Sequence, residues 1–182
     1  MRYHHSFLIS LSFIGCFLGC QSTPSLTGAE LTRKYPEKRY LQVDGVALHY
    51  EQEGIGPPVV LLHGVLTHSA LWRTIVSGLT YGNTLYTVDL MGFGFSEKPQ
   101  HIVYSLDTYV AQLDSFINLL KLDRPALVGH GLGAIIAVLY TVRNPNKVDK
   151  LVLMDAPFAN VTVPFSLRML RAPLFGAWVA GE

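Results

Sequence analysis

The chain has 182 residues, the length of one domain, and 49% of them are hydrophobic while 15% are charged. Fourteen Lys and Arg residues nearly balance thirteen Asp and Glu residues, so the net charge of +1 gives no indication of a nucleic-acid partner. Both cysteines lie within the first 20 residues, which excludes a disulfide, a thiol nucleophile or a thiolate metal site from the rest of the chain.

Residues 1–19 have the features of a secretory signal peptide, because a positive start at Arg2 precedes an apolar run. The residues Phe17-Leu18-Gly19-Cys20 resemble a bacterial lipobox, although Phe17 stands where Leu is usual. We therefore expect lipidation at Cys20 and an exported, membrane-anchored lipoprotein in the periplasm or at the cell surface. Phe13-Ile14-Gly15-Cys16 is a poorer match. The alternative is an ordinary cleaved signal peptide whose cysteines are incidental.

Residues 20–40 are predicted to be a polar tether and a charged lead-in. A hairpin follows over residues 41–50, because alternating apolar residues flank Asp44-Gly45, a strong turn signal. The continuous apolar run at residues 59–62 is typical of a strand buried on both faces of a parallel sheet.

The rest of the pattern alternates between helices and strands. We expect helices over residues 70–79, from Ser105 or Asp107 to about residue 120, and over 132–142, and strands over residues 85–88, 126–128 and 150–154. A glycine-rich loop occupies residues 89–99, and the periodicity is lost after residue 157. This alternation predicts a layered α/β domain with a mostly parallel sheet.

Three motifs each follow a predicted strand. They are His63-Gly64-Val65-Leu66-Thr67-His68-Ser69-Ala70-Leu71-Trp72, Asp89-Leu90-Met91-Gly92-Phe93-Gly94-Phe95-Ser96 and Gly129-His130-Gly131-Leu132-Gly133. In this order and spacing they resemble the α/β-hydrolase superfamily, in the branch of esterases, haloalkane dehalogenases, epoxide hydrolases and carbon–carbon bond hydrolases. The resemblance covers roughly residues 41–157. It implies a three-layer α/β-hydrolase fold that lacks the last strands, with residues 158–182 as the truncated start of a lid or cap.

The resemblance also implies roles for individual residues. Gly131 takes the nucleophile position of the elbow motif G-x-S-x-G, and the backbone N–H groups of Leu132 and Val65 would form the oxyanion hole. The loop of residues 89–96 is expected to be structural. A pocket for a small apolar molecule would be lined by residues of all three motifs, namely His63, Gly64, Trp72, Phe93 and His130.

Two departures from the family pattern predict an inactive chain. Glycine has no side chain that could attack a substrate, and no histidine follows His130 in the sequence to act as the base. Asp155, at the end of a predicted strand, is a candidate for the catalytic acid; the alternative is an aspartate that caps a loop. His130 is expected to pack beside its strand rather than to take part in catalysis.

No cofactor and no metal are expected, because the sequence contains no phosphate loop, dinucleotide fingerprint or metal-ligand cluster; His63 and His68 lack a third ligand. The strand at residues 150–154 would be an apolar sheet edge, which favours self-association. Three functional hypotheses stay open: a hydrolase-family enzyme that has lost activity, a membrane-tethered binding module (a pseudoenzyme), and a fragment without an independent role.

Overall fold

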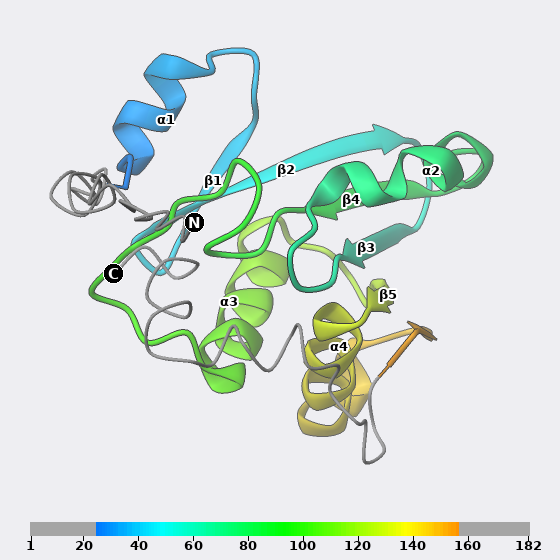
Figure 1. Cartoon of the computed structure of the whole chain (residues 1–182). Helices are drawn as coiled ribbons and strands as arrows, with labels where there is room; N and C mark the ends of the chain where they lie inside the picture. The colour runs from blue at the N-terminus through cyan, green and yellow to red at the C-terminus, as the bar shows by residue number, and fades with distance from the viewer. Residues whose placement is uncertain (1–24, 157–182) are drawn as a thin grey trace, which may run out of the picture. The chain divides into compact units, whose positions relative to one another are not determined.

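The computed structural model describes residues 25–156, which contain a six-stranded sheet in the order β1-β2-β4-β3-β5-β6 (Figure 1). Strands β3 to β6 run parallel to their neighbours among themselves, whereas β2 is antiparallel to both β1 and β4. The mostly parallel sheet with an N-terminal hairpin is therefore confirmed. The strands are β1 (Tyr40–Val43), β2 (Val46–Gly54), β3 (Pro58–Leu62), β4 (Thr84–Val88), β5 (Ala126–His130) and β6 (Leu151–Met154).

The hairpin forms where the sequence predicts it. Asp44 and Gly45 connect β1 to β2, and both have positive φ angles, 49° and 82°. A two-residue turn with positive φ at both positions matches the twist of antiparallel strands. The turn therefore fixes the register in which Val43 pairs with Val46.

The helices occupy the predicted connections between strands. A short 3₁₀ helix, η1 (Ser69–Trp72), continues into α2 (Arg73–Leu79), followed along the chain by α3 (Leu106–Leu119), α4 (Leu132–Arg143) and a second 3₁₀ helix, η2 (Pro145–Lys147). Ser105 caps α3, because its hydroxyl accepts a hydrogen bond of 3.1 Å from the Thr108 N–H. The structure thus selects Ser105 over Asp107 as the cap.

One helix within the predicted lead-in is missed by the sequence analysis. Helix α1 (Gly28–Lys34) begins with a capping box, in which the Thr27 hydroxyl accepts from the Glu30 N–H while the Glu30 carboxylate accepts from the Thr27 N–H. The available signal was the capping-box spacing, in which Glu30 lies three residues after Thr27. The many charged residues and Pro36 obscured it.

Apolar side chains of the sheet pack on both of its faces. Val60 and Leu62 of β3 join the larger core cluster, which α3 and α4 cover, whereas Leu61 joins a smaller cluster with α2 residue Val76. Neighbouring residues of a strand point to opposite faces, so only a strand covered on both sides has an uninterrupted apolar run.

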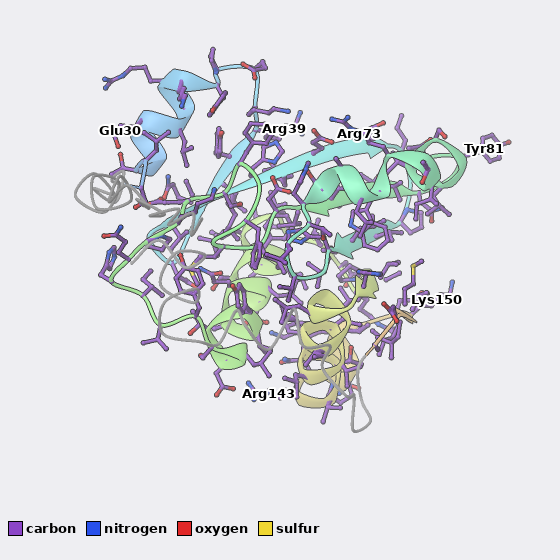
Figure 2. The ribbon with its side chains drawn as sticks, viewed as in Figure 1. Glu30, Arg39, Arg73, Tyr81, Arg143 and Lys150 are labelled. Carbon is purple, nitrogen blue, oxygen red and sulfur yellow. The ribbon has the colours of Figure 1, made fainter. Side chains whose placement is uncertain are left out.

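The last described strand lies at the sheet edge. Strand β6 pairs with β5, and its residues Val152, Leu153 and Met154 are 48%, 39% and 41% exposed. Within residues 25–156 no helix is both long enough and apolar enough to cross a bilayer. The labelled cations in Figure 2 belong to separate parts of the described chain: Arg39 before β1, Arg73 in α2, Arg143 in α4 and Lys150 before β6.

Candidate functional site

The turn between β5 and α4 has the backbone geometry of a nucleophile elbow. Gly131, which precedes the first residue of α4, has φ 54° and ψ −112°. This region of conformational space is strained for any residue with a Cβ atom, and such strain typically occurs at functional sites. The strand-to-helix corner expected from the sequence therefore lies at Gly131.

Hydrogen bonds from both sides fix this corner. The Gly131 N–H donates to the Met154 carbonyl over 3.1 Å, and the Gly133 N–H donates to the His63 carbonyl over 3.1 Å. A Cβ atom on Gly133 would overlap the Leu62 carbonyl, so the approach of α4 to the end of β3 requires glycine there. The elbow is thus tied to the ends of β3 and β6.

The first turn of α4 presents a backbone donor beside the elbow. The N–H groups of Ala134 and Ile135 both donate to the Gly131 carbonyl, at 3.2 and 3.3 Å, and the Gly133 N–H donates to the His63 carbonyl. Among the described residues, the Leu132 N–H has no hydrogen-bond acceptor. A free N–H at a helix start can stabilise negative charge on a ligand oxygen.

The end of β3 lies directly against the elbow. Among the described residues other than its chain neighbours, a Cβ atom built on Gly131 would meet only the Cα atom of Gly64 within 4 Å, at 3.5 Å. Val65, the next residue, is 55% exposed. His63 is fully buried, and its ring contacts Phe93 edge to face with 5.5 Å between centroids. The structure therefore brings His63, Gly64 and Phe93 together near Gly131.

His130 also lies against Gly64 and reaches toward β6. A Cβ atom on Gly64 would lie 2.7 Å from His130 Nδ1, so the ring packs closely over that glycine. His130 Nε2 lies 3.9 Å from Asp155 Oδ2, beyond hydrogen-bond distance, and the Asp155 side chain is 89% exposed. His130 Nδ1 is buried and has no partner among the described residues.

Trp72 lies in the smaller core cluster and not beside the elbow. Its side chain is 2% exposed and packs with Leu61, Val76, Leu85 and Val128 in the smaller core cluster. The expectation that Trp72 lines a substrate pocket does not fit this position, because a buried core residue has no surface left for a ligand. The sequence places an aromatic residue after the loop but does not say which face of the sheet receives it.

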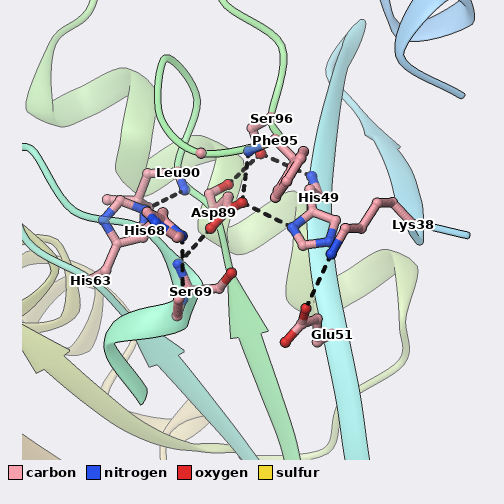
Figure 3. A network of polar contacts seen from close by, with 12 residues as sticks. Lys38, His49, Glu51, His63, His68, Ser69, Asp89, Leu90, Phe95 and Ser96 are labelled. Atoms are coloured by element: carbon pink, nitrogen blue, oxygen red, sulfur yellow. Dashed lines mark hydrogen bonds and ion pairs between the residues drawn. The ribbon is translucent and has the colours of Figure 1, made fainter. Parts of the chain in front are cut away.

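A buried polar network around Asp89 holds the loop that follows β4 (Figure 3). The carboxylate accepts hydrogen bonds from His49 Nδ1 (2.9 Å), the Ser69 N–H (2.6 Å) and the Phe95 N–H (2.8 Å). Burial alone would raise the pKa of Asp89, but these three hydrogen bonds outweigh it and hold the pKa at about 2. The Ser96 hydroxyl donates to the Asp89 carbonyl, so the loop is fixed by its own polar residues.

Sequence reasoning did not find the His49 side of this network. His49 is 1% exposed and lies on β2, forty residues before its partner. A histidine in an alternating strand pattern gives no indication of such a distant contact. A cavity of about 200 Å³ between α1 and the same loop, with Leu31, Tyr35, Phe95 and Lys98 among its lining residues, was also not foreseen.

Several predictions concern residues outside the described part of the chain. They are the signal peptide, lipidation of Cys20 and the start of a lid over residues 158–182. Within residues 25–156, no three His, Cys, Asp or Glu side chains gather in a way that could hold a metal ion.

Comparisons with known proteins point to one fold family. Residues 57–181 match the model of the family described as "alpha/beta hydrolase fold". Among curated proteins, the chain is 36% identical over 121 residues to a 2-hydroxy-6-oxo-2,4-heptadienoate hydrolase of Pseudomonas putida, covering 65% of this chain and 44% of the relative. It is 34% identical over 125 residues to haloalkane dehalogenase 2 of Mycobacterium bovis, covering 68% of this chain and 44% of the relative. The chain thus spans less than half the length of these relatives.

Solved structures give the same result. The haloalkane dehalogenase DatA from Agrobacterium tumefaciens is similar with a TM-score of 0.69 and 32% identity, covering 76% of this chain and 50% of that one. A meta-cleavage product hydrolase from Pseudomonas fluorescens, as a mutant complexed with acetates, is similar with a TM-score of 0.62 and 30% identity, covering 65% and 44%. The family match spans more than half of the chain, and the chain therefore belongs to the alpha/beta hydrolase fold family.

Proposed function

We propose that this chain descends from hydrolases of small apolar esters, halides or epoxides and retains their oxyanion hole, the backbone N–H groups that bind a substrate oxygen (the oxygen site). We further propose that the chain does not form a covalent bond with the substrate. The observation that carries the proposal is the conformation of Gly131, an elbow backbone with no side chain to attack a substrate. In a serine hydrolase, loss of the nucleophile lowers turnover on the order of a millionfold. Backbone donors do not depend on that side chain.

The relatives support the choice of substrates. One curated relative is named a haloalkane dehalogenase, and similar solved structures include an epoxide hydrolase and an esterase. One similar solved structure is a complex with acetates, which makes a small carboxylate a reasonable probe for the oxygen site proposed here. We assign to this site the Leu132 N–H, which has no acceptor within residues 25–156, and the N–H of the exposed Val65.

Two measurements on the purified chain test the proposal. Incubation with p-nitrophenyl butyrate, a short haloalkane and a small epoxide should give no product above the buffer rate. Titration with butyrate should shift the backbone amide resonances of Leu132 and Val65. Turnover that is lost when elbow residues are changed would contradict the inactivity, and unchanged amide resonances would contradict the oxygen site.

A second candidate is a membrane-tethered binding module, favoured by the lipobox-like residues before Cys20. Attachment of several acyl chains to this cysteine would anchor the protein stably, because one chain alone binds membranes only marginally. A bacterial host that expresses the chain should incorporate labelled fatty acid into it. The Cys20→Ser variant should lose the label, whereas Cys16→Ser should keep it; equal labelling of the two variants would exclude Cys20 as the site.

A further inference from the structure

The carbonyl group of Gly64, beside the elbow, accepts two side-chain hydrogen bonds. His63 Nδ1 lies 2.8 Å from this oxygen, and the Thr67 hydroxyl donates to it over 2.9 Å. One donor comes from the residue before Gly64 and the other from three residues after it. The two together fix the direction of one carbonyl in a loop that follows β3.

The hydrogen bond at Nε2, the other ring nitrogen of His63, shows which of the two nitrogens carries the proton. The Leu90 N–H donates to His63 Nε2 over 3.0 Å, so Nε2 is an acceptor and the proton lies on Nδ1. The ring is fully buried, and burial lowers the pKa of His63, which keeps the imidazole neutral near pH 7. The Nδ1 proton is therefore available to the Gly64 carbonyl (Figure 3 shows the contact of His63 with Leu90).

The direction of this carbonyl determines the direction of the next N–H. In a planar trans peptide, the carbonyl of Gly64 and the N–H of Val65 point to opposite sides. In the described part of the chain, and leaving out the neighbours of Gly131 in sequence, Gly64 lies nearest to the empty Cβ position of Gly131. Leu66, one residue further, has φ 60°, which is strained for a residue other than glycine. The loop therefore needs external contacts to hold this path.

We propose that Thr67, acting together with His63, is a positioning residue that directs the Val65 N–H toward the space beside Gly131. The inference rests on the proposed function, because the directed N–H is the second donor of the oxygen site. Thr67 does not contact the ligand. Its hydroxyl acts through the Gly64 carbonyl, and its side chain is only partly buried, so it can be changed without disturbing the core.

The test compares Thr67→Val, which removes the hydroxyl at constant shape, with Thr67→Ser, which keeps it. In the ¹⁵N-labelled full chain, partly aligned in a stretched gel, the residual dipolar coupling of the Val65 amide reports the direction of its N–H bond. We expect Thr67→Val to change this coupling and to abolish the butyrate-induced shift of Val65. Thr67→Ser should restore both, and the Leu132 amide should behave as in the unaltered chain throughout.

The outcomes separate the two proposals. A wild-type Val65 coupling in Thr67→Val would overturn the positioning role, whether or not butyrate binds. Absence of any butyrate response at Leu132 in the unaltered chain would contradict the proposed function, while the coupling would still decide the role of Thr67. Should Thr67→Val fail to fold, the ¹⁵N shifts of the His63 ring in the unaltered chain decide. A protonated Nδ1 supports the inference, and a protonated Nε2 overturns it.

Discussion

A Cβ atom on Gly131 would lie 3.5 Å from the Cα atom of Gly64, an ordinary van der Waals contact. As far as residues 25–156 show, the elbow therefore has room for a Cβ atom. What opposes a side chain at this position is the backbone, because φ is 54°. Active members of such folds accept that strain in order to present a nucleophile.

The Gly131→Ala variant tests whether backbone strain, and not a steric clash, opposes a side chain at this position. We expect its free energy of unfolding to fall by about 1–2 kcal/mol, because a residue with a Cβ atom is less stable in this conformation. Urea unfolding followed by circular dichroism measures the change. A loss of much more than this would mean that the position is also sterically closed, which contradicts the contact geometry.

Gly133→Ala should be far more destabilising than Gly131→Ala. Its Cβ atom would overlap the Leu62 carbonyl at the end of β3, and backbone atoms on both sides cannot move apart easily. The matched control is Gly78→Ala in α2, where no atom of another described element lies within 4 Å of the new Cβ atom. Alanine should stabilise this helix by about 0.5–1 kcal/mol. Thermal unfolding of the two variants should therefore shift in opposite directions. A stable Gly133→Ala variant would contradict the close approach of α4 to β3.

The low pKa of Asp89 predicts that the free energy of unfolding decreases at acid pH. Its pKa in the folded chain is about 2, below the ordinary value of 3.8, so the ionised carboxylate stabilises the fold above pH 4. That contribution, about 2 kcal/mol, is lost as the pH falls from 4 through 2. Asp89→Asn should be less stable at pH 7, and its free energy of unfolding should change less between pH 4 and 2. Parallel pH profiles for the two proteins would show that Asp89 does not carry this stabilisation.

The sheet and its connections could be predicted from the sequence because their signals are local. Asp44-Gly45 specifies a turn, and an apolar run such as residues 59–62 specifies a doubly covered strand, whatever the rest of the chain does. The position of the elbow was predictable for the same reason. The spacing of its glycines allows a strand to turn into a helix within very few residues.

The parts that were not predicted depend on contacts between distant residues. The His49 side chain on β2 forms a hydrogen bond with the carboxylate of Asp89, which follows β4. Trp72 packs in the core cluster on the face of the sheet that α2 covers. Neither outcome is encoded in a short window. The same holds for His63, whose two ring nitrogens serve Gly64 and Leu90 on different elements. The sequence motifs marked His63 and Trp72 as candidate pocket residues but did not show what each one contacts, and they gave no sign of His49.

We expect the chain to self-associate through β6, the exposed edge strand of the sheet. Val152 on β6 is 48% exposed, and Val152→Lys would place a charge on an edge that could otherwise pair with another copy. We expect this variant to stay monomeric at concentrations where the unaltered chain associates, as measured by sedimentation velocity. Val142→Lys on α4, at a residue that is 74% exposed, is the control and should associate like the unaltered chain. Equal behaviour of the two variants would exclude β6 as the contact.

Intact-protein mass spectrometry after incubation with p-nitrophenyl butyrate tests most directly whether the elbow has lost its chemistry. A nucleophile would leave a butyryl group on the protein, either transiently or, without a competent base, as a lasting adduct. We predict an unchanged mass for the chain with Gly131, and release of p-nitrophenolate no faster than in buffer. A butyryl adduct mapped to a side chain of residues 63–69 or 129–133 would contradict the account, because it would show an attacking atom where we find none.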